Sequence, residues 1–282
     1  MTAVTRTGTV QTPASARTDG TPRRPRSNRF DVPALRAQPG GFAARFATRF
    51  GNRHPAVVFL AALLLGFAVV AALSVGIGEF VNKVLLPAAG IGRADESVNV
   101  WLAEHRSTTL TDASSLGSTL GGAPLLPILA GVIALTFAAL RQWRLAGYAA
   151  LGLAVESALY RLTTLSVPRH RPDVPRLDSL PVNASYPSGH TAASVVVYAG
   201  IALLVTSGLT RRSSRALAWS AAATMALFVA GSRLYRGMHH PIDVLAGALL
   251  GLAALVVLVW ACRAAGACAA ARARASGTSA EQ

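Results

Sequence analysis

Six long apolar runs between residues 56 and 262 constrain the fold of this chain more than any other feature. A helix needs roughly twenty mostly apolar residues to cross a hydrocarbon layer that is about 30 Å thick. The runs therefore predict an all-α, six-span transmembrane helix bundle. We expect the spans at residues 56–80, 116–140, 145–166, 191–209, 216–231 and 242–262.

The charge content supports a membrane protein and argues against nucleic-acid binding. Charged residues make up 14% of the chain, whereas soluble domains carry about 25%. The net charge of +15 raises the alternative of a nucleic-acid partner. However, the basic residues lie in an N-terminal tail and in short connections between apolar runs, a distribution typical of proteins that orient themselves in a bilayer. We therefore expect membrane lipids, and no nucleic acid, as partners.

The sequence predicts that the two ends of the chain are tails on the cytoplasmic side. Residues 1–54 are rich in Arg, Pro, Gly, Ser and Thr, a composition too poor in large apolar residues to offset the entropy of ordering, so we expect a disordered basic tail. Residues 40–53 fit either a short amphipathic helix or, preferably, a plain basic flank. Residues 264–282 form a second tail. Cys262 and Cys268 have no histidine nearby, so we expect neither a metal site nor a disulfide framework.

Basic residues in the short loops predict the orientation of the bundle. If every run crosses the membrane, four basic clusters fall on one side, which is then cytoplasmic. These clusters contain Arg49 and Arg53, Arg141 and Arg144, Arg211, Arg212 and Arg215, and Arg263, Arg272 and Arg274. Both termini are then cytoplasmic. The loops around residues 81–115, 167–190 and 232–241 face the extracytoplasmic side.

Two of these extracytoplasmic loops carry residues suited to binding a tetrahedral oxyanion. Ser188 and Gly189 stand at the start of the fourth span, where free backbone N–H groups and the helix dipole favour negative charge. Arg171 and Arg233 can each donate paired hydrogen bonds to phosphate oxygens. Together they predict a phosphate site.

The same loops carry candidate reactive groups. His239 and Asp243 stand four residues apart at the start of the last span, so Asp243 can accept a hydrogen bond from one ring nitrogen and leave the other as a nucleophile. His190, from a different loop, can protonate the leaving oxygen. We predict His190, His239 and Asp243 as the catalytic residues.

These segments resemble the motifs of the type 2 phosphatidic acid phosphatase superfamily. Pro187–His190 matches its P-S-G-H motif, and Ser232, Arg233, His239 and Asp243 match its S-R-x5-H-x3-D motif. The resemblance covers about residues 115–260. It implies attack of His239 on phosphorus to give a phosphohistidine, with His190 as general acid and base. It also implies that Arg171, Ser188, Gly189 and Arg233 hold the phosphate oxygens, without a metal or cofactor.

The first family motif is incomplete, and two other ionisable residues raise questions. Arg171-Pro172 supplies its end, but Thr164 stands where the family has lysine. We hypothesise that Arg161, one turn away on the same helix, replaces that lysine. Glu156, within the third run, is a functional candidate by default, although neutralisation of a buried arginine is the favoured interpretation.

Several further residues receive no firm role from the sequence. We expect His54, His105 and His170 to be inert and assign no role to His240. For Arg169 and Arg236, two interpretations are equally good: they screen the substrate charge at the rim of the pocket, or they are ordinary solvated residues.

The leading interpretation is a membrane phosphatase for a lipid phosphate or lipid pyrophosphate. Undecaprenyl-type pyrophosphate, phosphatidic acid and phosphatidylglycerol phosphate all fit. The alternative is a non-catalytic lipid-phosphate binder or scrambler. It is favoured by Thr164, which stands where the family motif has lysine. A transporter would need ionisable residues at the bilayer midplane, and beyond Glu156 the runs offer almost none. The sequence leaves the oligomeric state open.

Overall fold

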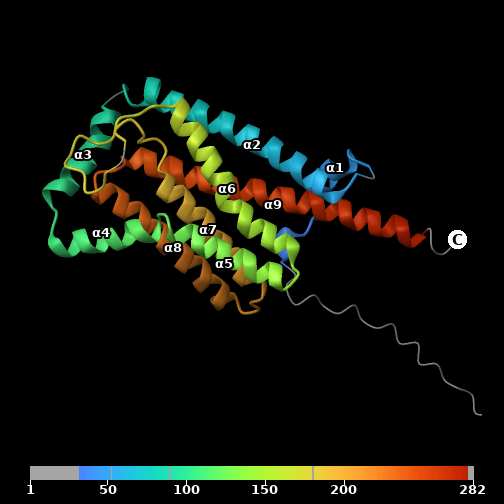
Figure 1. Cartoon of the computed structure of the whole chain (residues 1–282). Coiled ribbons are helices and arrows are strands. Elements are labelled where there is room, and N and C mark those ends of the chain that lie inside the picture. Colours follow the sequence, from blue (N-terminus) through green and yellow to red (C-terminus); the bar gives the residue numbers. More distant parts are fainter. Residues whose placement is uncertain (1–31, 52, 89, 180, 279–282) are drawn as a thin grey trace, which may run out of the picture.

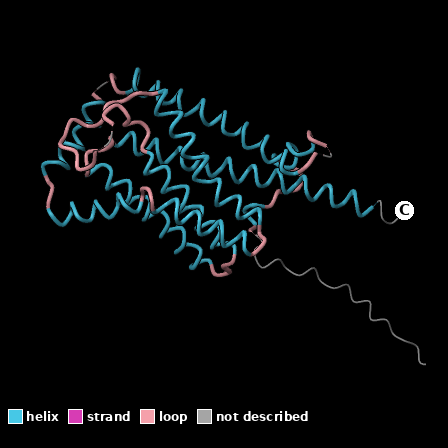
Figure 2. The backbone as a smooth tube through the Cα atoms, in the orientation of Figure 1, coloured by secondary structure: helices cyan, strands magenta, loops and turns pink. Residues whose placement is uncertain are grey.

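The computed structural model describes residues 32–278 except residues 52, 89 and 180, and all regular elements within this part are helical (Figures 1 and 2). In chain order they are η1 Pro33–Leu35, α1 Phe42–Thr48, α2 Pro55–Phe80, η2 Val81–Leu85, α3 Ile91–Glu104, α4 Thr108–Leu120, α5 Leu125–Ala139, α6 Trp143–Ser166, α7 Gly189–Ser207, α8 Arg212–Tyr235 and α9 Pro241–Thr278. The predicted all-α fold is confirmed.

Five segments of the described chain are long and apolar enough to cross a membrane. They are Pro55–Leu85, Thr108–Ala139, Gly189–Ser207, Arg212–Tyr235 and Pro241–Ser276. The chain is therefore a multi-pass membrane protein. The helix α6 is not among these five, because polar residues such as Glu156 and Arg161 lower its hydropathy. It nevertheless packs against α2, α5, α7 and α9 within the bundle.

The long helix α9 organises the bundle and packs against α2, α7 and α6 (Figure 1). Glycines allow these helices to approach closely. A Cβ atom on Gly251 would lie 2.4 Å from the Ala192 carbonyl oxygen, and one on Gly247 would lie 2.3 Å from the Ser188 carbonyl oxygen. Contacts this short are impossible for any larger residue. The start of α7, where the P-S-G-H motif ends, is therefore held directly against α9.

The predicted second span is not one helix. Residues 121–124 interrupt it and separate α4 from α5. A Cβ atom on Gly121 would lie 2.3 Å from the Val229 side chain, and one on Gly122 would lie 3.2 Å from Nε2 of His190. The interruption therefore lets the chain pass close to α8 and brings backbone next to a predicted catalytic histidine.

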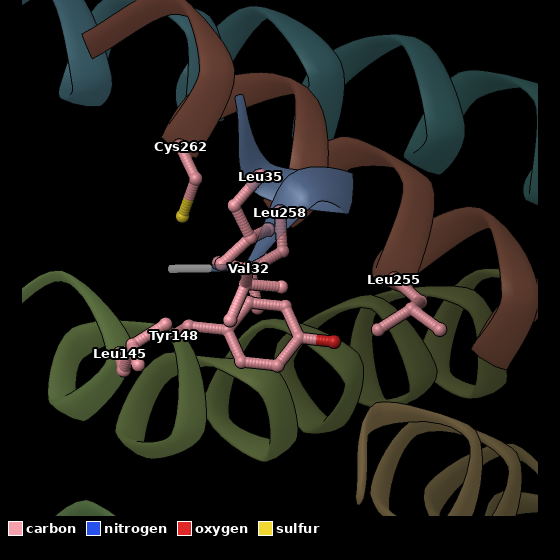
Figure 3. Packing of buried hydrophobic residues seen from close by; sticks show 7 residues of the cluster. All are labelled: Val32, Leu35, Leu145, Tyr148, Leu255, Leu258 and Cys262. Atoms are coloured by element: carbon pink, nitrogen blue, oxygen red, sulfur yellow. The ribbon is translucent and has the colours of Figure 1, made fainter. Parts of the chain in front are cut away.

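The expectation of a disordered tail through residue 54 is wrong for residues 32–51, and residues 1–31 and 52 lie outside the described part. Val32 and Leu35 are buried against Tyr148 and Leu258 in the bundle core (Figure 3). Arg263 Nε also donates to the Ala34 carbonyl oxygen at 2.7 Å. A few apolar anchors and arginine contacts order this segment in spite of its polar composition.

The short helix α1 is likewise packed on protein. Ala43 and Ala47 are buried against α2 and α9, and the rings of Phe42 and Phe46 lie 5.5 and 5.0 Å from the ring of Trp260. At the other end of the chain, α9 continues beyond residue 262 to Thr278. Much of the segment predicted as a C-terminal tail is therefore helical.

Candidate active site

Three segments that are distant along the chain meet at the end of the bundle that carries α3 (Figure 1). They are the loop between α6 and α7, the first turn of α7, and the turn between α8 and α9. Between them lies a cavity of about 280 Å³. Its wall includes Arg171, Gly189, His190 and His239. The two histidines predicted to be catalytic therefore border one cavity.

His239 is buried and held in a defined tautomer. Its Nδ1 lies 2.6 Å from the Ser185 carbonyl oxygen, which can only accept a hydrogen bond, so Nδ1 carries the proton. Its Nε2 is then unprotonated and accepts a long hydrogen bond from Nη1 of Arg171 at 3.4 Å. Burial lowers the pKa of His239 to about 3; the Asp243 charge opposes this shift, and the Arg171 and Arg233 charges add to it. The imidazole is therefore neutral near pH 7, as a nucleophile must be.

The depressed pKa predicts that the protein loses stability on acidification. Between about 3 and the ordinary value of 6.5, the unfolded chain binds a proton that folded His239 excludes. The free energy of unfolding therefore falls as pH falls through this window, by up to about 1.4 kcal/mol per pH unit. We expect thermal unfolding in detergent to show a smaller loss of Tm between pH 7 and pH 4 for His239→Asn than for the wild type. Equal losses would contradict this environment for His239.

Asp243 does not orient His239 in the predicted way. Its two carboxylate oxygens are taken by other groups: Oδ1 pairs with Arg169, and Oδ2 accepts from Ser185 Oγ at 2.6 Å and from the His240 N–H at 2.9 Å. Ser185 thus links the two residues, because its hydroxyl donates to Asp243 while its carbonyl holds His239. Ser185 lies just before the P-S-G-H motif, and no pattern in the sequence indicated this role.

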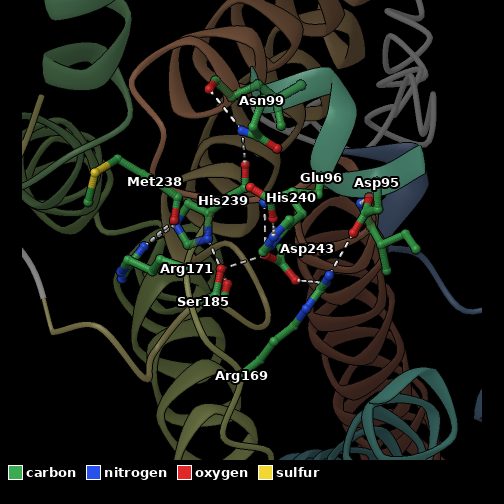
Figure 4. A network of polar contacts seen from close by, with 12 residues as sticks. Asp95, Glu96, Asn99, Arg169, Arg171, Ser185, Met238, His239, His240 and Asp243 are labelled. Carbon is green, nitrogen blue, oxygen red and sulfur yellow. Dashed lines mark hydrogen bonds and ion pairs between the residues drawn. The ribbon is translucent and has the colours of Figure 1, made fainter. Parts of the chain in front are cut away.

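Arg169 is part of a buried ion-pair network and is not a solvated rim residue. It lies between Asp95 and Asp243, with Nη2 2.6 Å from Asp95 Oδ2 (Figure 4). Asp95 also accepts from the Ile242 N–H at 3.0 Å, which caps the start of α9. Both carboxylates are buried, and Arg169 is the guanidinium that pairs with each of them. The network connects α3 to the start of α9, where Asp243 lies.

Removing the Arg169 guanidinium will destabilise the protein strongly. The Arg169→Met variant leaves two buried carboxylates without their cation, a defect that costs about 3–5 kcal/mol. As a control, Lys83→Met removes an exposed partner of Glu79, for which about 1 kcal/mol or less is expected. Thermal unfolding in detergent measures both. A change in Tm for Arg169→Met no larger than that for Lys83→Met would show that the network does not support the fold.

The helix α3 also fixes the backbone of the catalytic turn. Asn99 Nδ2 donates to the His239 carbonyl oxygen at 3.0 Å and to the Leu234 carbonyl oxygen at 3.1 Å. His240, to which the sequence gave no role, is buried between Asp243 and Glu96, and its Nε2 lies 2.8 Å from Glu96 Oε2. These contacts position His239 through its neighbours.

Arg233, at the end of α8, offers two unpaired donors. It is fully buried, and its Nη1 donates to Ser118 Oγ at 2.6 Å and to Asp178 Oδ2 at 2.7 Å. Its Nε and Nη2 have no hydrogen-bond partner within the described chain. Buried guanidinium N–H groups without partners are costly. Two such groups on one side chain are suited to a ligand oxyanion.

Asp178 bridges Arg233 and Arg236. Arg236 is buried, and its Nε and Nη2 both contact the Asp178 carboxylate, at 3.1 and 2.6 Å. Burial alone would raise the pKa of Asp178, but hydrogen bonds and charge from Arg236 and Arg233 outweigh it and lower that pKa to about 2. Arg236 is thus neither a solvated nor a rim residue, because it holds the loop between α6 and α7 against α8.

Arg171 is positioned by backbone carbonyl groups. Nε and Nη2 donate to the carbonyl oxygens of Pro181 and Ala184, each at 2.8 Å, and Nη1 donates to that of Met238. Burial lowers its pKa to about 10, so Arg171 remains a cation at neutral pH. Its Nη1 faces His239 Nε2, which places positive charge beside the predicted nucleophile.

Ser188 and Gly189 begin α7 as predicted, although the serine side chain has a local role. Ser188 is the N-cap of α7, and its Oγ lies 2.9 Å from Thr191 Oγ1. A Cβ atom on Gly189 would lie 2.9 Å from the Tyr160 ring, so only glycine fits there. Contact of Ser188 and Gly189 with phosphate stays a prediction.

Arg161 does not reach the cavity. The buried face of α6 passes through Leu159 and Thr163, and Arg161, two residues from each, lies about 200° around the helix from them. Its side chain is exposed and is not part of the cavity wall. Thr164, at the position of the family lysine, bonds the Tyr186 carbonyl oxygen at 3.1 Å through Oγ1. The hypothesis that Arg161 replaces that lysine is not supported.

Comparisons with known proteins show what the chain resembles. The family model of the PAP2 superfamily matches residues 142–266. The structure resembles that of the first transmembrane PAP2-type phosphatidylglycerolphosphate phosphatase from Bacillus subtilis, with a TM-score of 0.56 and 26% identity over 70% of this chain and 92% of that chain. LpxE of Aquifex aeolicus matches with a TM-score of 0.44 and 23% identity over 57% of this chain and 92% of that chain.

A curated relative provides a third similarity. An undecaprenyl-diphosphatase from Sulfolobus acidocaldarius is 40% identical over 75 residues, which are 27% of this chain and 32% of that protein. The match thus spans about a third of the relative's length. Two complete motifs converge on one cavity, and both lie within the region that the family model matches. Residues 142–266 of this chain thus match the PAP2 superfamily, the type 2 phosphatidic acid phosphatases that the sequence motifs resemble, and the similar structure from Bacillus subtilis is that of a PAP2-type membrane phosphatase.

Proposed function

We propose that the protein is a lipid phosphate phosphatase that acts through a phosphohistidine on His239. The observation that carries this proposal is the placement of His239, His190 and Arg171 around one cavity, with Nε2 of His239 unprotonated. Arg233 joins the same turn, since the Met238 N–H donates to the Arg233 carbonyl oxygen at 3.0 Å, and its Nε and Nη2 have no partner within the described chain. The match to the PAP2 superfamily and the similarity to two lipid phosphatases support the same activity.

In the first step, Nε2 of His239 attacks phosphorus as the bond from phosphorus to the ester oxygen breaks. Protonated His190 donates its proton to the leaving oxygen. Arg171 and Arg233 bind the phosphate oxygens and stabilise the charge that develops on them. The Ser185 carbonyl stabilises the cationic ring that forms, because it holds the proton on Nδ1.

In the second step, neutral His190 accepts a proton from water as the water oxygen attacks phosphorus. The bond between phosphorus and Nε2 breaks, and inorganic phosphate leaves. His239 regains its lone pair and His190 its proton, so the cycle closes. We propose that the two arginines and the start of α7 supply the positive charge for both steps, so that no metal is needed.

We propose further that α6 completes a six-span bundle and that the site opens at the outer leaflet. The basic clusters around residues 49–53, 141–144, 211–215 and 263–274 support cytoplasmic termini. The catalytic turns then lie at the opposite end of the helices. A lipid head group can enter there while its tail stays in the bilayer.

The experiment that tests this function measures phosphate release by the full-length protein in mixed micelles. The panel contains phosphatidic acid, phosphatidylglycerol phosphate and undecaprenyl diphosphate. We expect turnover of at least one of them by the wild type and none by His239→Ala. Binding of these lipids without phosphate release would instead support the non-catalytic binder or scrambler.

A further inference from the structure

The cavity contains a buried carboxyl group that the proposed reaction does not use. Glu156 in α6 is 2% exposed and is part of the cavity wall. Its Oε2 accepts from Ser157 Oγ at 3.3 Å, whereas Oε1 has no hydrogen-bond partner within the described chain. The favoured interpretation from the sequence, neutralisation of a buried arginine, is not supported, because no ion pair in the described part includes Glu156.

Glu156 lies deeper in the bundle than the phosphate-binding groups. Leu153, Glu156 and Tyr160 all contribute to the cavity wall from successive turns of α6. Tyr160 packs against Gly189 at the start of α7. Glu156, four residues earlier, is about 6 Å further along the helix axis. The rest of that end of the wall is apolar and includes Leu126, Pro127 and Ala193.

This position of Glu156 suits a contact with the alcohol that is esterified to the phosphate. With phosphorus beside His239, in-line displacement puts the leaving alcohol opposite Nε2, and the cavity whose wall includes His190 and Glu156 can receive it. A buried carboxyl oxygen without a partner is costly, and a hydroxyl on that alcohol satisfies it.

We propose, on the basis of the phosphatase function above, that Glu156 accepts a hydrogen bond from a hydroxyl group near the phosphate ester. The enzyme then prefers lipid phosphates whose leaving alcohol carries such a hydroxyl, as phosphatidylglycerol phosphate does. Phosphatidic acid and polyprenyl diphosphates lack that hydroxyl and are poorer substrates. Glu156 thus determines specificity and leaves the chemical step to the histidines.

Substitutions at Glu156 test this preference as a ratio of kcat/KM values. For Glu156→Leu, we expect the ratio of phosphatidylglycerol phosphate to phosphatidic acid to fall about tenfold. Glu156→Gln keeps an acceptor oxygen and should keep the ratio within about threefold of the wild type. Glu104→Leu, an exposed position at the end of α3, is the matched control. An unchanged ratio in Glu156→Leu would overturn the proposal.

A second measurement needs only the wild type and so does not depend on the folding of a variant. Glycerol 3-phosphate carries a hydroxyl beside its phosphate ester, and propyl phosphate does not. We expect glycerol 3-phosphate to inhibit about tenfold more strongly, and equal inhibition would count against the proposal. If the wild type released phosphate from no lipid, the proposed phosphatase function itself would be wrong. If it released phosphate from all the lipids at equal rates, only the proposed role of Glu156 would be wrong.

Discussion

Replacing His239 by alanine will lower kcat/KM for phosphate release by at least about 10³-fold. The ring is the only group described in the cavity that presents an unprotonated nitrogen beside Arg171. Its tautomer is set by the Ser185 carbonyl oxygen. Without the ring, no group is placed to form the covalent intermediate. Water must then attack the phosphate ester directly. The assay is phosphate release in mixed micelles at saturating and limiting substrate.

A second histidine at the same end of the bundle provides the control. His105 is exposed at the end of α3, and its ring stacks on Trp101 at 4.4 Å. His105→Ala should change kcat/KM by less than about twofold, since surface residues away from a site rarely matter. If His239→Ala retained most of the activity, the assignment of the nucleophile would be wrong.

Replacing Arg233 by lysine will lower kcat/KM by about 10²- to 10³-fold, although the charge is conserved. Nε and Nη2 of Arg233 have no partner in the described chain, while Nη1 is held by Ser118 and Asp178. A guanidinium can present two parallel N–H groups to phosphate oxygens, and an ammonium cannot reproduce that fork. Losing donors aimed at the transition state typically costs a factor of this size.

Arg161→Ala is the matched control for the loss of an arginine. Its side chain is exposed on the far face of α6, so we expect kcat/KM to change by less than about twofold. A large loss there would revive the hypothesis that Arg161 replaces the family lysine. Comparable activity of Arg233→Lys and the wild type would show that the unpaired donors of Arg233 do not bind phosphate.

The fold class and the convergence of the motifs could be predicted from the sequence because both rest on strong local patterns. Apolar runs indicate membrane helices, and P-S-G-H with S-R-x5-H-x3-D places reactive residues at helix ends. The cavity wall that contains His190 and His239 is consistent with that reasoning. Helix boundaries were less predictable. Residues 121–124 interrupt an apolar run, because tertiary contacts with α8 and His190 override local hydrophobicity there.

The network around the nucleophile could not be predicted, because it depends on contacts between residues that are far apart in sequence. Arg169 pairs with Asp95, which is 74 positions away, and no spacing rule links them. Asp243 was expected to contact His239 from helical spacing alone, but Arg169, Ser185 and His240 compete for its oxygens. The order of residues 32–51 was likewise missed, because it rests on a few anchors such as Val32 and Leu35.

Trapping of the phosphoenzyme tests the account most directly. An aryl phosphate is the substrate of choice, because its leaving group needs no proton and so the first step proceeds without His190. We predict that rapidly quenched His190→Ala accumulates phosphate in an acid-labile, alkali-stable bond on residue 239, and that His239→Ala accumulates none. Labelling of any other residue, or equal labelling in the two variants, would contradict attack by His239.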